Sequence, residues 1–277
     1  KHLTTRRIRS AGETDLTELL ARMRQALIIL CTTSCLGGLP IYASVAAVML
    51  LGASSGHATI PAPITPLVGR VELGAPEKTA DATVACMYPM TGRSASYGRD
   101  SIVGIKLALE ELSADPAAPR LRVIVDDSRS KSSFAVRMAE DFIRQDNANI
   151  LCGMVSSGVG MAVSRLAKQR KIILIGTDHA SSRATLEEGH EYYFRVSSDT
   201  WYSHAAGARY LQELQQKTGW KKLAFLGPDY EYGRVAWRDL QQALELLGVD
   251  YEVTGTYWPK LYEPDYSLYI QALLESQ

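Results

Sequence analysis

Residues 83–112 read TVACMYPMTGRSASYGRDSIVGIKLALEEL. The stretch opens on an apolar run of strand length, Val84 to Tyr88, and then passes through the turn-rich segment PMTGRSASYG. After the turn, apolar residues recur at helical spacing, namely Ile102, Ile105, Leu109 and Leu112. The pattern predicts a strand, a polar loop at its carboxyl end, and a helix that starts directly after the loop.

The loop between the predicted strand and helix carries groups that bind rather than react. It offers the hydroxyls of Thr91, Ser94 and Ser96, several backbone N–H groups and one aromatic ring, Tyr97. It holds no histidine, cysteine or acid before Asp100. Because ligands of open α/β sheets bind at the carboxyl ends of the strands, we expect capture of a small polar molecule and no enzymatic activity.

Composition places the chain among globular proteins and excludes one class of partner. Of its 277 residues, 46% are hydrophobic and 22% are charged, and this length is enough for two α/β lobes. The 30 basic and 30 acidic residues cancel. No broad positive field therefore favours nucleic acid as a partner.

The four cysteines fall into two pairs. Cys31 and Cys35 lie in an apolar N-terminal run, whereas Cys86 and Cys152 lie inside predicted strands. The sequence contains no CxxC and no Cys/His group with metal-ligand spacing, so we expect neither a metal site nor a cofactor. For Cys86 and Cys152 we favour buried free thiols over the alternative, a disulfide between neighbouring strands.

The N-terminal extension, residues 1–58, has the features of an export segment. Residues 26–53 carry no charge, Arg22 and Arg24 precede them, and the small-residue sequence GHA follows. We expect a signal segment that directs the protein to the periplasm or another extracytoplasmic site. A retained membrane anchor is the alternative, because the apolar run exceeds about 18 residues. Contact with a membrane is expected only through this segment.

A linker is expected at residues 59–81, which hold four prolines, and strands and helices alternate after it. Strand patterns close on Asp, Ser, Thr or Gly, and helix patterns follow them. This alternation predicts a parallel sheet with helices on both faces, whose polar loops converge at one edge. The further strands are expected at 121–125, 150–155 and 172–175, and the further helices at 132–145 and 159–170.

A first α/β lobe is expected to span residues 82–198, and part of a second lobe residues 199–277. The second lobe begins to repeat the strand and helix pattern and does not finish it, so we expect it to be incomplete. We expect the hinge between the lobes near residues 196–200. In the second lobe, helices are expected at 201–217, 235–247 and 265–276, and strands at 222–226 and 251–258.

The order and spacing of four short motifs carry a resemblance to a known family. The motifs are PMTG with a following YG, then DDS, then SSG, and finally DYEYG in the second lobe. Across residues 82–277 the chain resembles the periplasmic substrate-binding proteins of ABC importers, of the branched-chain amino-acid type. The resemblance implies the type I periplasmic-binding-protein fold, here truncated at its C-terminus.

The resemblance also implies a function. Two lobes would close over a branched-chain amino acid or a related amino acid or amide, and an ABC importer permease would then receive it. Closure of this kind is a hinge motion driven by contacts that form only in the closed state. The alternative is a ligand-sensing receptor domain of the same fold that acts on a regulator.

The family pattern also implies site residues in the first lobe. Tyr97 falls where the family places an aromatic ring against the ligand, and Ser156 and Ser157 fall where a serine after the third strand holds a carboxylate. Helix N-termini favour such anions. Asp178 and Ala180 fall near the ligand ammonium; Ala180 lacks the hydroxyl that the family uses, whereas Asp178 adds a carboxylate able to pair with an ammonium.

In the second lobe the resemblance implies that Tyr232 supplies a closing aromatic ring. The acid that the family uses to bind the amino group is expected beyond Gln277. Adjacent acids at a strand end, as in Asp126-Asp127, are interpreted as turn formers and not as metal ligands. His179 and His204 are interpreted as surface histidines.

Overall fold

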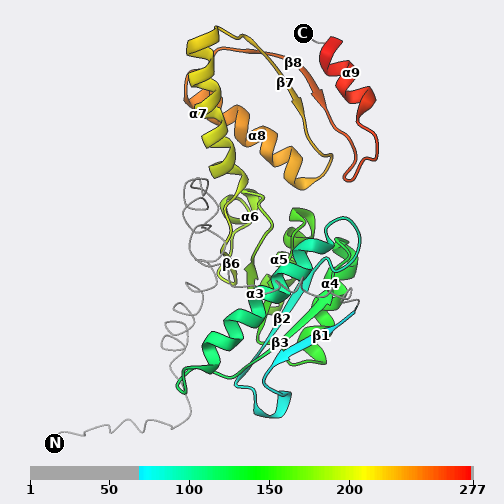
Figure 1. Ribbon diagram of the computed structural model, residues 1–277. Helices are drawn as coiled ribbons and strands as arrows, with labels where there is room; N and C mark the ends of the chain where they lie inside the picture. Colours follow the sequence, from blue (N-terminus) through cyan, green and yellow to red (C-terminus); the bar gives the residue numbers. More distant parts are fainter. Residues whose placement is uncertain (1–68, 276–277) are drawn as a thin grey trace, which may run out of the picture. The chain divides into compact units, whose positions relative to one another are not determined.

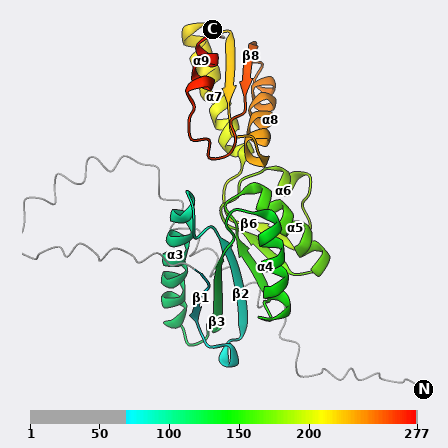
Figure 2. The ribbon, with the colours of Figure 1, turned by 90° about the vertical axis from the view of Figure 1, so that its right-hand side faces the viewer.

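The computed structural model describes residues 69–275. The expected export segment, residues 1–58, lies outside this range, as does the first part of the expected linker. Within the range, a six-stranded sheet has the order β1-β3-β2-β4-β5-β6 (Figures 1 and 2). Its strands are β1 (Val71–Gly74), β2 (Ala82–Tyr88), β3 (Leu121–Asp127), β4 (Ile150–Gly153), β5 (Ile173–Gly176) and β6 (Tyr193–Arg195).

Every neighbouring pair in this sheet is parallel except β1 and β3, which are antiparallel. The helices that alternate with the strands are α3 (Ala95–Ser113), α4 (Ser132–Arg144), α5 (Ser157–Arg170) and the short α6 (Arg183–Leu186). The predicted strands and helices are thus confirmed, with ends that move by a few residues. The largest shift is at α3, which begins at Ala95 and so takes Tyr97 out of the predicted loop.

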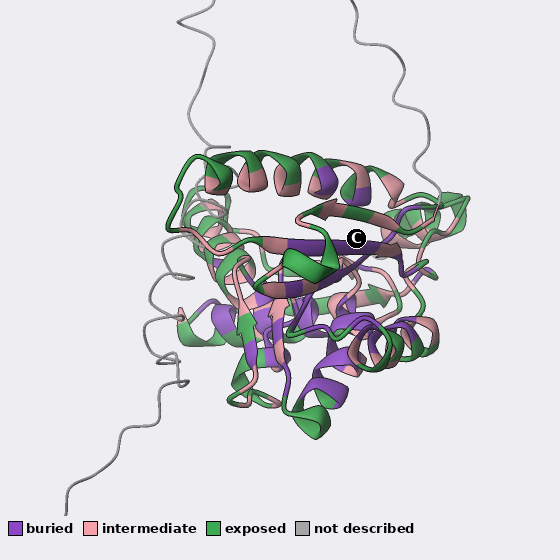
Figure 3. Cartoon of the chain, turned by 90° about the horizontal axis from the view of Figure 1, so that it is seen from below, coloured by how far each residue is buried: buried purple, intermediate pink, exposed green. Residues whose placement is uncertain are grey.

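One core cluster joins the sheet to α4 and α5. Ala85, Ile124 and Leu151 come from the central strands and are fully buried, and Phe142 of α4 and Val163 of α5 pack in the same cluster. Figure 3 shows the central strands coloured as buried. Since both faces of a parallel strand are normally covered, continuous apolar runs such as VACMY are what such strands require.

The predicted linker at residues 59–81 needs correction in its described part. Val71–Gly74 forms β1, an edge strand on β3, and Glu77–Thr79 forms a 3-10 turn. A side-chain contact helps to hold β1 against β3. The buried guanidinium of Arg122 on β3 donates to Glu72 on β1 at 3.0 Å. A four-residue strand is too short for its alternation to stand out from a linker in sequence.

The preference for free thiols at Cys86 and Cys152 is wrong. The parallel register of β2 and β4 places the two residues opposite each other, with 4.4 Å between their Cα atoms, and they form a disulfide. Both side chains are buried. Only the pairing of the strands shows this, because the cysteines are 66 residues apart in the chain.

A second, two-stranded parallel sheet consists of β7 (Lys222–Leu226) and β8 (Glu252–Tyr257). Both strands are confirmed, as are the helices around them, α7 (Thr200–Thr218), α8 (Glu231–Leu246) and α9 (Ser267–Glu275). Ala208 of α7 and Leu244 of α8 are buried in one cluster. The side chain of Asp199 caps α7 by accepting from the N–H of Tyr202. The hinge expected nearby stays a prediction.

None of the helices within residues 69–275 is both long and apolar enough to cross a membrane.

Candidate functional site

Four loops meet at the carboxyl edge of the six-stranded sheet. β2, β3, β4 and β5 are parallel, so their carboxyl ends share that edge. Backbone bonds tie the loops together: the N–H groups of Ser128 and Met154 donate to the carbonyl groups of Tyr88 and Met87, both at 2.8 Å. The predicted convergence of the polar loops is therefore confirmed.

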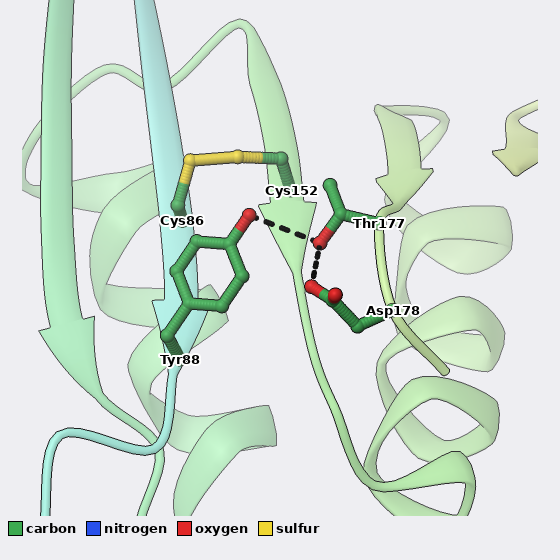
Figure 4. Close-up of a disulfide and its surroundings, with 5 residues drawn as sticks. All are labelled: Cys86, Tyr88, Cys152, Thr177 and Asp178. Atoms are coloured by element: carbon green, nitrogen blue, oxygen red, sulfur yellow. Dashed lines mark hydrogen bonds between the residues drawn. A yellow bond between two sulfur atoms is a disulfide. The ribbon is translucent and has the colours of Figure 1, made fainter. Parts of the chain in front are cut away.

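A chain of hydrogen bonds joins the ends of β2 and β5 (Figure 4). The hydroxyl of Thr177 donates to Asp178 at 2.7 Å and lies 3.0 Å from the hydroxyl of Tyr88. A threonine hydroxyl has one proton, so Tyr88 must be the donor to Thr177. The chain thus runs from Tyr88 through Thr177 to the carboxylate of Asp178.

Burial determines the acid–base properties of Tyr88 and Asp178, the two ends of this series of hydrogen bonds. It raises the pKa of Tyr88 to about 12, so the phenol keeps its proton at neutral pH. Burial also raises the pKa of Asp178, and the hydrogen bond from Thr177 offsets this only in part. No cationic side chain within residues 69–275 forms an ion pair with Asp178.

Asp127, at the end of β3, differs from Asp178 because several donors surround its carboxylate. Its carboxylate accepts from the N–H of Met90 at 2.8 Å, the hydroxyl of Thr91 at 2.6 Å and the N–H of Arg129 at 2.8 Å. Burial alone would raise its pKa, but these three donors outweigh burial and lower it. Asp127 therefore holds the loop after β2 in place, in agreement with the interpretation of this acid as a turn former.

Replacing Asp127 with asparagine should lower the free energy of unfolding at pH 7 by about 1–3 kcal/mol, because buried donors lose a charged acceptor. The lowered pKa of the folded state means that the carboxylate stabilises the fold above its unfolded pKa of about 3.9. This contribution disappears as the pH falls through the folded pKa. Urea denaturation at pH 7 and below pH 4 should show a difference between wild type and variant that shrinks in acid, while exposed Asp141→Asn changes little.

The two predicted serines differ in what they contact. Ser156 is the residue that precedes α5, is half-buried, and makes no side-chain bond to the helix. Ser157 is buried, and its hydroxyl accepts from the N–H of Ala180 at 3.3 Å. Ser156 therefore occupies the N-cap position of α5. Ser157 links the loop after β4 to the loop after β5, and Ala180 takes part through its backbone.

Tyr97 and Tyr232 lie in the first turns of α3 and α8. Tyr97 is half-exposed, and the ring of Tyr232 lies 6.2 Å from the ring of Tyr230 and near His204. Burial raises the pKa of Tyr230 to about 12, and Tyr232, Tyr262 and Tyr97 add to the shift. Four tyrosines therefore gather here, and the sequence motifs SYG and DYEYG predicted a site role for two of them, Tyr97 and Tyr232. The motif DYEYG contained the signal for Tyr230.

The interpretation of His179 as a surface residue is wrong. Its side chain is fully buried, and a Cβ atom added at Gly160 or Gly176 would lie within 2.6 Å of its ring. Its Nε2 atom lies 3.1 Å from the hydroxyl of Tyr193. Burial, with a contribution from Arg195, lowers its pKa to about 4, so the imidazole is neutral at physiological pH and serves the packing.

A family model described as a periplasmic binding protein matches residues 81–277. The chain belongs to the periplasmic binding protein family. A curated relative, the Leu/Ile/Val-binding protein homolog 7 of Brucella abortus, is 23% identical over 203 residues, which are 69% of this chain and 49% of the relative. The resemblance to the branched-chain amino-acid type is thereby confirmed.

Solved structures share the fold. A solute-binding protein of an ABC transporter from Rhodopseudomonas palustris BisB5, in complex with 3,4-dihydroxybenzoic acid, aligns with a TM-score of 0.62 and 25% identity over 70% of this chain and 52% of that one. The leucine-binding protein LivK of Thermotoga maritima aligns with a TM-score of 0.61 and 19% identity over 70% and 53%. The chain spans about half the length of these periplasmic binding proteins.

Proposed function

We propose that this chain is part of an extracytoplasmic solute-binding protein that captures a small amino-acid-like or amide ligand and delivers it to an ABC importer. The observation that carries the proposal is the family match, which includes all four loops at the carboxyl edge of the first sheet. Those loops present hydroxyls, backbone N–H groups and a carboxylate. Such groups suit the orientation of a small polar ligand.

The disulfide supports a location outside the cytoplasm. Disulfides persist in the periplasm and other oxidising compartments, whereas cytosolic thiols are kept reduced. The bond between Cys86 and Cys152 joins the core strands β2 and β4, close to Tyr88, Thr177 and Asp178 (Figure 4). This is independent of the expected signal segment, which stays a prediction because residues 1–58 lie outside the described range.

The start of α5 is the proposed anchor for a ligand carboxylate. The first N–H groups of a helix have no partner within the helix, and its dipole favours an anion there. Ser156 adds a half-buried hydroxyl that no capping bond occupies. Tyr97 and Tyr232 are proposed to contact the apolar part of the ligand from α3 and α8.

Calorimetric titration of the full-length mature protein, with a complete second lobe, tests the proposed function. L-Leucine, L-isoleucine, L-valine, L-glutamine, benzoate and 4-hydroxybenzoate form a suitable panel. At least one should bind saturably at one site with micromolar affinity, equivalent to about −8 kcal/mol. A folded protein that binds none of them would contradict the proposal.

The two neighbouring serines provide a matched pair of variants. Ser156→Ala should weaken binding of the best ligand by about 1–3 kcal/mol and leave the unfolding midpoint nearly unchanged, because its hydroxyl makes no capping bond. Ser157→Ala should instead lower the stability by about 1 kcal/mol, since it leaves a partly buried N–H without its acceptor. Exposed Thr218→Ala, at the end of α7, serves as the control. Equal affinity in Ser156→Ala and wild type would remove Ser156 from the site.

A further inference from the structure

Two neighbouring segments at the carboxyl edge of the first sheet, residues 89–99 after β2 and 128–139 after β3, carry basic residues and no acidic ones. Their basic residues are Arg93, Arg99, Arg129, Lys131 and Arg137. The chain as a whole has 30 basic and 30 acidic residues, so this local excess is not a property of its composition. β2 and β3 are parallel neighbours with Tyr88 opposite Asp127, so the two segments begin side by side.

Most arginines within residues 69–275 form ion pairs with acids. The exceptions are Arg93, Arg99, Arg129, Arg137 and Arg209. Four of these five lie in the two segments. A single exposed arginine without an acid is ordinary, but a group of them on adjacent loops creates a local positive potential.

Phe134 on α4 brings two of these charges together. The guanidinium carbon of Arg129 lies 4.7 Å from the centroid of the Phe134 ring, and that of Arg137 lies 5.8 Å from it. The ring is half-buried and packs against the core, so its position is fixed. Attraction between a cation and an aromatic face offsets part of the repulsion between the two guanidinium groups. Two exposed positive charges are thus held next to each other.

The backbone at Arg129 is itself unusual. Arg129 and Ser130 have φ of +50° and +53°, a conformation that residues with side chains adopt at a cost in free energy. The carboxylate of Asp127 fixes this turn by accepting from the N–H of Arg129, and it also accepts from Thr91 in the loop that carries Arg93. One buried acid therefore positions both basic loops. The charge of Arg129 contributes in turn to the lowered pKa of Asp127.

We propose that four exposed cations, Arg93, Arg129, Lys131 and Arg137, called here the basic rim, dock an acidic surface of a protein partner, which in the function proposed above is the permease of the importer. The inference rests on that proposed function and adds the surface through which the two proteins meet. The basic rim adjoins the loops of the candidate site, so a partner bound there lies beside the ligand. Complementary charge speeds association and selects the partner, and arginine is enriched among the residues that dominate binding.

Anionic lipid headgroups share the chemistry of an acidic protein surface, but the side chains around the basic rim favour a protein. Segments that bind a membrane surface place apolar side chains into the bilayer. The exposed residues of 128–139 are Arg129, Lys131, Ser133 and Arg137, none of which is apolar. Phe134 packs against the core and is not free to enter a bilayer.

Uptake by the organism that encodes this protein tests the docking surface. The gene of the full-length protein is replaced by variants, and uptake of the most tightly bound ligand of the panel above is measured with radiolabel. Arg129→Glu with Arg137→Glu should lower uptake by about tenfold or more, because an acidic partner is then repelled. The affinity of the purified variant for the same ligand, measured by calorimetry, should stay nearly unchanged.

A matched pair of substitutions controls for the change in net charge. Arg209→Glu with Lys217→Glu, both exposed on α7, should leave uptake nearly as in wild type. Arg129→Lys with Arg137→Lys keeps both charges and should retain most of the uptake. Arg93→Glu with Lys131→Glu leaves the contacts of Phe134 intact and should also lower uptake, so a folding defect in the first variant cannot hide the result.

The outcomes separate the basic rim from the solute-binding function. Unchanged uptake in both reversed pairs overturns the proposal, as does an equal loss in the α7 pair. A loss of ligand affinity that matches the loss of uptake assigns the residues to the ligand site and also overturns it. Sedimentation with vesicles of phosphatidylcholine and phosphatidylglycerol should show no binding; binding that the reversed pairs abolish assigns the basic rim to lipid instead. If the folded wild type binds no ligand of the panel, the solute-binding function itself fails.

Discussion

Replacing Gly153 with alanine should lower the free energy of unfolding by about 3 kcal/mol or more. Gly153 ends β4 with φ of +105°, a conformation that side chains rarely adopt. An added Cβ atom would lie 2.7 Å from the carbonyl oxygen of Met87 and 3.0 Å from its amide nitrogen. Met87 lies in β2, which pairs with β3 and β4, so its backbone has little freedom to move aside.

The same substitution should also damage the candidate site, because Gly153 directly precedes the loop that leads to Ser156. Chemical denaturation and calorimetry on one preparation measure both effects. Gly207→Ala is the control: it lies within α7, where no atom is within 4 Å of the added Cβ. Alanine in that helix should be neutral or stabilise by up to about 1 kcal/mol. A loss below about 1 kcal/mol in Gly153→Ala would contradict the described turn.

Replacing Cys86 and Cys152 together with alanine should lower the free energy of unfolding by about 2–4 kcal/mol. The bond closes a loop of 66 residues, and a crosslink over so long a loop restricts the unfolded chain strongly. Alanine is preferred to serine because both positions are buried, where an unpaired hydroxyl would add its own cost.

Denaturation with and without dithiothreitol measures the contribution of the disulfide. Reductant should destabilise the wild type and leave the double variant unchanged. Thiol titration of the unfolded, non-reduced protein provides an independent check on the bond. If Cys86 and Cys152 both react as free thiols in protein exported to the periplasm, the disulfide is absent and loses its value as support for that location.

The sequence alone was sufficient for the local elements and their order. Strand-length apolar runs and helical spacing predicted β2 to β5 and α3 to α5 to within a few residues, because both signals depend on neighbours within one or two turns. The parallel arrangement followed from the alternation of strands and helices. It placed the loops that carry Ser157 and Asp178 at the same edge, as the structure confirms.

Contacts between distant residues depended on the tertiary structure. The register of β2 against β4 paired Cys86 with Cys152, and the pairing of β1 with β3 turned part of an apparent linker into an edge strand. The tertiary structure also gives the carboxylate of Asp127 three hydrogen-bond donors and the carboxylate of Asp178 one. Local periodicity does not contain a register, since a shift of one residue leaves the pattern intact and reverses every side chain.

The group of four tyrosines, Tyr97, Tyr230, Tyr232 and Tyr262, shows the same division between sequence and structure. The motifs SYG and DYEYG identified Tyr97 and Tyr232, but Tyr230 and Tyr262 joined them only through folding. The sequence by itself determined which groups this chain offers to a ligand: hydroxyls, helix N-termini, tyrosines and one carboxylate after β5. The tertiary structure decided which of them already have a partner, because burial and pairing depend on segments that lie far apart in the chain.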